Sequence, residues 1–225
     1  MIVAQQKPLD EIREMLAGYR RPLVLGCGTC VTVCFAGGEK EVALLATSLR
    51  AVLGEGVEIA EALVQRQCEW EFLDQAREAV ERADVVLSLG CGVGVQGVAE
   101  HYPGRVTLPG LNTTGLALTE APGVWTARCL ACGDCLLDLT GGVCPIARCA
   151  KSLLNGPCGG AQDGHCEIST DIPCAWVLIH ERLTALGRQD LLEEIIPTRD
   201  WRASHAGGPR RISRPDLQEP AGEEG

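Results

Sequence analysis

The chain has 225 residues and a formal net charge of −10; 46% of its residues are hydrophobic and only 4% are aromatic. The negative charge argues against a nucleic-acid partner, and no stretch approaches the roughly 20 apolar residues of a membrane span. The N-terminal residues include acids and form no apolar signal-peptide core, so we expect a soluble cytoplasmic protein.

The first half of the chain alternates predicted helices and strands. Short apolar strands are predicted at 23–25, 57–64, 85–89 and 106–108, and helices at 8–18, 39–53, 70–82 and 92–101. This alternation predicts an α/β fold: an open parallel sheet with right-handed crossovers, which forms a Rossmann-like domain over residues 1–121.

Five cysteines follow the predicted strands. Cys27, Cys30 and Cys34 follow the first strand, Cys68 the second and Cys91 the third. Because the carboxyl ends of parallel strands meet at the edge of the sheet where ligands bind, we predict a metal site there. A four-iron cluster is narrowly favoured over zinc, and at least one of the five is then spare. The alternative is that they are ordinary buried thiols.

Gly92-Val-Gly-Val-Gln-Gly97 matches the dinucleotide-binding fingerprint. We reject NAD binding because the acidic residue expected about 20 positions later is missing, and Asn112 lies in that neighbourhood instead. The motif also follows the third strand rather than the first. We expect these glycines to let the backbone turn tightly around Cys91, with the helix N-terminus facing an anionic cluster.

The second half begins with residues 109–125, which are rich in Gly, Thr and Pro and are predicted to form a linker. A cysteine-rich domain is predicted over 122–187, followed by a helix and an extended tail over 188–225. The tail carries arginines up to Arg214, and it either frays or wraps a partner. Helices are predicted at 146–154, 174–187 and 189–196.

Eight of the thirteen cysteines lie in a segment too poor in large apolar residues to form its own core. Three thiolates spaced Cys-x2-Cys-x2-Cys on one loop are typical of iron–sulfur binding, and the fourth cysteine precedes a proline. Structural zinc is the alternative, although zinc ribbons use two separated Cys-x2-Cys pairs. We predict two four-iron clusters, one held by Cys129, Cys132, Cys135 and Cys144, the other by Cys149, Cys158, Cys166 and Cys174.

Several ordered motifs resemble the methylenetetrahydrofolate reductase C-terminal family, in its MetV-type subunit. They span roughly residues 20–185 and include Gly26-Cys-Gly-Thr-Cys-x3-Cys-x2-Gly-Gly-Glu, Gln65-Arg-Gln-Cys-Glu-Trp, Cys129-x2-Cys-Gly-Asp-Cys, Thr140-Gly-Gly-x-Cys-Pro, Asn155-Gly-Pro-Cys-Gly-Gly and Cys174-x-Trp. The resemblance implies an electron-transfer subunit that carries iron–sulfur clusters, with zinc as an option in one site. It implies a TIM-barrel partner subunit that holds the flavin and the folate, and ferredoxin or another low-potential electron donor.

The residues outside the cysteines agree with an electron carrier. We find no nucleophile–base pair, no paired general acid and base and no sound phosphate loop, so we predict no catalytic residue and no flavin in this chain. Two alternatives stay open: a zinc-stabilised scaffold subunit of the same complex, and an independent iron–sulfur enzyme.

Overall fold

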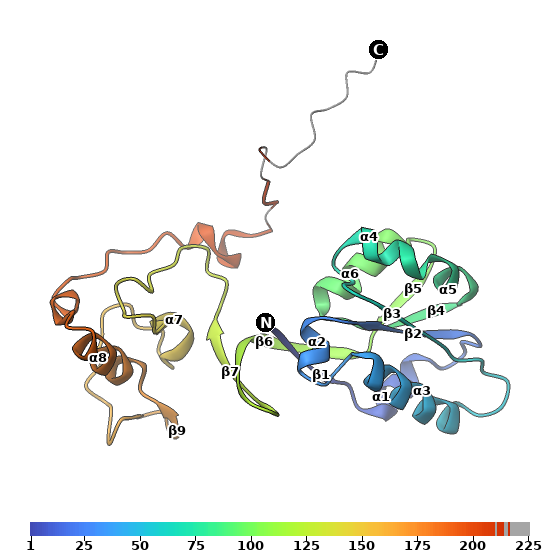
Figure 1. The fold of residues 1–225 in the computed structure, drawn as a ribbon, viewed down its shortest axis with the longest axis horizontal. Coiled ribbons are helices and arrows are strands. Elements are labelled where there is room, and N and C mark those ends of the chain that lie inside the picture. Colours follow the sequence, from blue (N-terminus) through green and yellow to red (C-terminus); the bar gives the residue numbers. More distant parts are fainter. Residues whose placement is uncertain (210, 214–215, 217–225) are drawn as a thin grey trace, which may run out of the picture. The chain divides into compact units, whose positions relative to one another are not determined.

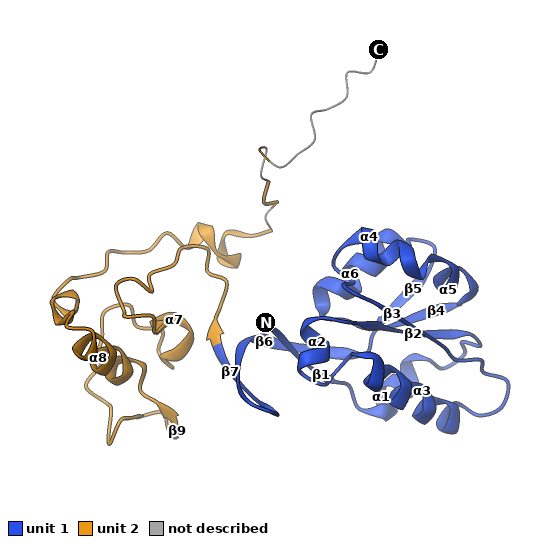
Figure 2. Ribbon diagram, viewed as in Figure 1, with its two compact units in different colours: residues 1–127 blue, residues 128–225 orange. Residues whose placement is uncertain are grey.

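The computed structural model describes residues 1–209, 211–213 and 216. The chain folds as two compact units, the first Met1–Ala127 and the second beginning at Arg128 (Figure 2). None of the helices formed by the described residues is long and apolar enough to cross a membrane.

A four-stranded parallel sheet forms the centre of the first unit, as the sequence predicts (Figure 1). Its strands lie in the order β3-β2-β4-β5, and every adjacent pair is parallel. The predicted open sheet is therefore confirmed, and β2 lies between β3 and β4. The strands are β2 (Pro22–Cys27), β3 (Ala60–Val64), β4 (Val85–Leu89) and β5 (Val106–Pro109).

Helices cover both faces of this sheet, because side chains alternate along each buried strand. Val24, Val85 and Leu87 belong to one core cluster, while Leu23, Leu25 and Val86 belong to another. Helices α1 (Leu9–Met15) and α3 (Glu39–Leu53) pack on the first cluster, and α4 (Trp70–Leu73), α5 (Arg77–Arg82) and α6 (Gly92–His101) on the second (Figure 1).

One predicted helix has the expected bounds, and another is interrupted. Helix α3 occupies the predicted residues, begins where the Gly38 N–H donates to Glu41 Oε2 at 3.0 Å, and ends at Gly54, whose φ is +80°. The helix predicted at 70–82 is instead interrupted between α4 and α5 by a 3₁₀ turn, Asp74–Ala76.

A second, antiparallel sheet replaces the predicted linker. Strands β1 (Ile2–Gln6), β6 (Leu111–Ala121) and β7 (Val124–Cys129) lie in the order β1-β6-β7. The linker prediction for 109–125 is wrong because most of β6 is exposed, so its sequence lacks an apolar pattern. Pro122 and Gly123, whose φ is +81°, form the turn between β6 and β7.

The second unit is rich in cysteine and contains short elements, as predicted. Its apolar core is small: Trp176, Ile179 and Leu183, all on one helix, form its buried cluster. A unit with so small a core depends on other links for its stability. Its elements are α7 (Pro145–Arg148), β8 (His165–Cys166), β9 (Ser169–Pro173), α8 (Ala175–Ala185) and the 3₁₀ turns Gln189–Leu192, Trp201–Ala203 and His205–Gly207.

Candidate metal centres

Three cysteines gather at the carboxyl edge of the parallel sheet. Cys27 is the last residue of β2, Cys68 follows β3, and Cys91 caps the N-terminus of α6 directly after β4. Burial raises the pKa of the Cys68 thiol, and the charges of Cys27 and Cys91 raise this pKa further, because both lie near it. The fold therefore brings together cysteines from three neighbouring strands.

The buried side chain of Gln67 holds the Cys68 loop against this edge. Its Nε2 donates to the carbonyls of Leu25 at 2.8 Å and Gly26 at 3.1 Å, and its Oε1 accepts from Ser88 Oγ at 2.5 Å. Gln67 thereby links the loop after β3 to the ends of β2 and β4. Gln67 directly precedes Cys68, but the spacing of the residues along the sequence does not indicate this role.

The glycines of the fingerprint-like motif make room for this loop. A Cβ at Gly97 would lie 2.6 Å from the carbonyl oxygen of Gln67, and a Cβ at Gly94 would lie 2.9 Å from its Cβ. These positions need glycine because the backbone around Gln67 packs directly on α6. The motif is thus explained by close packing of the segment that carries Cys68.

Cys30 and Cys34 are placed differently from the other three. Cys30 is the first residue of the short helix α2 (Cys30–Val33) and is half-buried. Cys34 is buried in the apolar core, where its single S–H lies within hydrogen-bond reach of the carbonyls of Ala4, at 3.6 Å, and Val31, at 3.5 Å. A thiol with these partners is already satisfied, so Cys34 is the least suited of the five to bind metal.

In the second unit, four cysteines line one cavity of about 220 Å³. They are the first predicted set: Cys129, Cys132, Cys135 and Cys144. Leu130, Leu136, Leu137 and Ile146 supply apolar walls. This volume is below the roughly 300–1,000 Å³ of pockets for drug-sized organic ligands, so the cavity suits a compact inorganic group.

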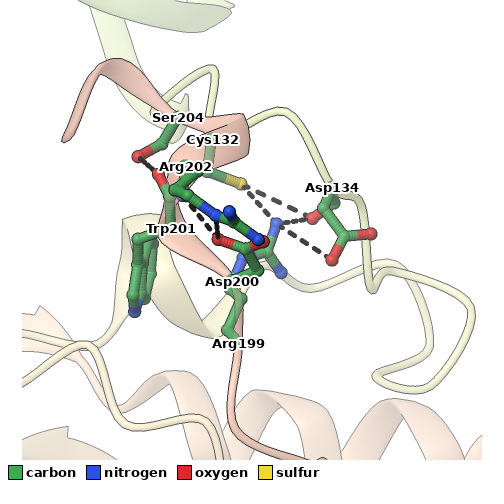
Figure 3. Close-up of polar contacts among 7 residues, drawn as sticks. All are labelled: Cys132, Asp134, Arg199, Asp200, Trp201, Arg202 and Ser204. Carbon is green, nitrogen blue, oxygen red and sulfur yellow. Dashed lines mark hydrogen bonds and ion pairs between the residues drawn. The ribbon is translucent and has the colours of Figure 1, made fainter. Parts of the chain in front are cut away.

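A segment near the end of the described chain packs on the loop that carries these cysteines (Figure 3). The Nη2 of Arg199 lies 3.2 Å from the sulfur of Cys132 and also donates to the carbonyl of Asp134. The turn at Trp201–Ala203 approaches so closely that a Cβ at Gly133 would lie 2.0 Å from the carbonyl oxygen of Ala203. From the sequence, Arg199 is expected only to be one of the arginines of the tail.

The second predicted set lines a separate, much smaller cavity. Cys149, Cys158, Cys166 and Cys174 surround about 20 Å³ together with Lys151 and Trp176. The pKa of the Cys158 thiol is lowered, chiefly because the Gly160 N–H donates to it, and the charge of Lys151 lowers it further. Lowering this pKa favours the thiolate, which is the form that binds metal.

Trp176 fixes the loop that leads to Cys158. Its Nε1 donates to the carbonyl of Leu153 at 3.1 Å, and its ring lies where a Cβ at Gly156 would be, with ring atoms 2.4 Å away. The packing of α8 therefore positions both Cys174, at its N-terminus, and the loop before Cys158.

Four cysteines line each of the two cavities of the second unit. Thiolates are metal ligands, and four of them are enough for one metal centre. Within the described part of the chain, no three Cys, His, Asp or Glu side chains converge closely enough to hold a metal ion as they stand. Binding would therefore have to draw the thiolates inward, and their division between the centres stays a prediction.

Comparison with known proteins gives one match. Residues 108–202 match a family model described as "Methylene-tetrahydrofolate reductase C terminal". The match contains all eight cysteines of the second unit as well as Arg199, and it supports the resemblance for this part of the sequence. No curated protein and no solved structure matches the chain.

Proposed function

We propose that this chain is an electron-transfer subunit of a methylenetetrahydrofolate reductase complex and that its cysteines hold iron–sulfur clusters. The observation that carries the proposal is the partition of the cysteines from 129 to 174. The first four line one cavity and the last four another. Each set supplies the four thiolates that a four-iron cluster requires. The family match over residues 108–202 supplies the link to the reductase.

When bound, the clusters would supply one-electron carriers, and the chain's own residues would set where they lie and how exposed they are. Cys129, Cys132 and Cys135 would hold one group from a single loop, and Cys144, before α7, would supply the fourth ligand. Cys149, Cys158, Cys166 and Cys174 would hold the other. In the first unit, Cys27, Cys68 and Cys91 are the best-placed ligands for a third metal.

The partners follow from the same proposal. A flavin-bearing TIM-barrel subunit would receive the electrons and reduce the folate, and ferredoxin or another low-potential donor would supply them. The chain itself would bind no flavin and make no bond.

An activity assay tests whether this chain only carries electrons while the flavin subunit reduces the folate. The anaerobically purified chain should accept electrons from dithionite, bleach in the visible range, and reduce methylenetetrahydrofolate only when the flavin subunit is added. Folate reduction by the chain alone, with no flavin present, would contradict the relay and favour an independent enzyme.

A second candidate has one observation in its favour. The cavity of Cys149, Cys158, Cys166 and Cys174 encloses about 20 Å³, which is close to the space that one water molecule needs. A single zinc ion with four thiolates would need less rearrangement there than a cluster. If both cavities held zinc, the chain would be a scaffold that is colourless and cannot be reduced.

A further inference from the structure

We infer that Arg199 is a positioning residue for the metal centre of Cys129, Cys132, Cys135 and Cys144, and that it sets the electron affinity of this centre. The guanidinium does so through a charge-assisted hydrogen bond to the sulfur of Cys132 (Figure 3). The inference rests on the proposed function, because it requires a redox-active group at these cysteines.

The geometry of Arg199 is that of a buried hydrogen-bond donor. Its side chain is only 4% exposed, and its Nη2 lies 3.2 Å from Cys132 Sγ, which is within reach of a hydrogen bond to sulfur. The same nitrogen donates to the carbonyl of Asp134. Its Nε is buried and has no hydrogen-bond partner among the residues that the structure describes. The guanidinium therefore has donor capacity left beside the cysteine loop.

The described residues compensate the charge of Arg199 only weakly. Asp134 Oδ2 lies 3.8 Å from the Nη2 of Arg199, and the Asp134 side chain is 66% exposed, so water screens that pair. Burying a cation costs free energy unless an anion compensates it. A metal-bound thiolate at Cys132 would be such an anion.

The turn that follows Arg199 holds the guanidinium in place. The guanidinium carbon lies 5.4 Å from the centroid of the Trp201 ring, in a cation–π contact. Ser204 Oγ donates to the carbonyl of Trp201 at 2.6 Å and closes the turn. The turn also packs against Gly133, the residue after Cys132, so the backbone of the segment that carries Arg199 lies next to the cysteine loop.

The hydrogen bond from Arg199 should raise the reduction potential of this centre. One-electron reduction adds one negative charge to a group bound at Cys132, and a buried guanidinium stabilises the added charge. Hydrogen bonds to cluster sulfurs and local charge are the means by which proteins raise such potentials. Loss of this interaction should lower the electron affinity about tenfold, which corresponds to about 59 mV for a one-electron couple.

The test is an EPR-monitored potentiometric titration of the full chain, with dithionite as reductant, in the wild type, R199Q and R199K. R202Q is the matched control, because Arg202 lies on the same turn, its side chain is 88% exposed, and it pairs with Asp200. The variant C132S identifies which signal belongs to this centre. We expect R199Q to lower the potential of that signal alone, R199K to restore most of it, and R202Q to leave it unchanged.

The iron content of each protein shows whether a negative result contradicts the proposed function or only the inference about Arg199. Wild-type protein without iron would contradict the proposed function, and the Arg199 inference with it. Iron-loaded R199Q with an unchanged potential would overturn the inference alone. If R199Q loses the iron, R199K should retain both iron and potential, since it keeps the charge; loss in both variants would show a purely structural role for Arg199 and overturn the inference.

Discussion

The hydroxyl of Ser88 donates to the side-chain oxygen of Gln67 at 2.5 Å, and both side chains are completely buried. Ser88 lies in β4, and Gln67 lies in the loop after β3. Since the amide of Gln67 also reaches the end of β2, one side chain connects three strands where Cys27, Cys68 and Cys91 gather. The candidate site of the first unit is therefore built on a polar link inside the core.

Replacing Gln67 by Leu should destabilise the protein by about 3 kcal/mol or more. The change leaves the Ser88 hydroxyl and the Leu25 and Gly26 carbonyls without this partner, and a buried polar group without one costs about 1–3 kcal/mol. Urea unfolding followed by circular dichroism measures the effect. The control is Q65L, at an exposed glutamine two positions away. Equal midpoints for the two variants would contradict this role.

Replacing Gly97 by Ala should also destabilise the first unit, even though Ala favours helices by about 1 kcal/mol over Gly. The added Cβ would lie 2.6 Å from a backbone oxygen, which cannot rotate away, and such overpacking costs about 1–3 kcal/mol. Thermal unfolding should show a lower midpoint. G92A is the matched control, because its nearest neighbour would be Thr113 Oγ1 at 3.8 Å. A midpoint for G97A at or above that of G92A would refute the packing explanation.

In the first unit, loss of Cys91 should lower the metal content of the chain, whereas loss of Cys34 should leave it unchanged. The variant C91A should lower the metal content of the full chain, since Cys91 lies with Cys68 at the sheet edge. The variant C34A should not, because that thiol is buried and bonded to backbone carbonyls. Metal analysis after anaerobic reconstitution measures both. Loss of metal in C34A, with folding intact, would show that the core around Cys34 rearranges on binding.

Two truncations, of residues 209–225 and of residues 199–225, should distinguish the effect of Arg199 on the metal centre from binding of the tail to a partner. The shorter truncation keeps Arg199 and the turn on Gly133, so iron content and potential should stay at wild-type values. Removal of 199–225 should lower the potential of the centre at Cys132. The arm predicted to wrap a partner, residues 199–225, lies partly outside the described residues. If the arm has that role, co-purification with the flavin subunit should weaken after either truncation. Equal association in all three proteins would leave the tail without that role.

Much of the fold could be predicted because buried parallel strands carry nearly continuous apolar runs, such as Val85–Leu89, which is interrupted only by Ser88. Strand β6 could not be predicted because an exposed strand rich in Thr, Asn and Gly resembles a loop. Strand β1 has five residues, of which only Val3 and Ala4 are buried, so its apolar pattern is too short to indicate a strand. The turn at Pro122 and Gly123 was the one local sign of a hairpin.

The candidate sites could likewise be predicted only in part from the sequence. Regular spacing predicts which cysteines share a cavity in the second unit, because short loops keep neighbouring thiols together. Gln67 and Arg199 could not be identified from spacing, since each acts through a contact with residues far along the chain. Arg199 is 67 positions from Cys132, and nothing local in the sequence indicates that pairing.

Iron analysis of the anaerobically purified full chain, with its EPR spectrum, tests the central claim most directly. Two four-iron clusters in the second unit predict about eight irons per chain from that unit, with C144S and C149S each losing about four and a different reduced signal. Wild-type protein with fewer than about four irons per chain, or with zinc alone, would contradict the claim that this chain carries electrons through two clusters.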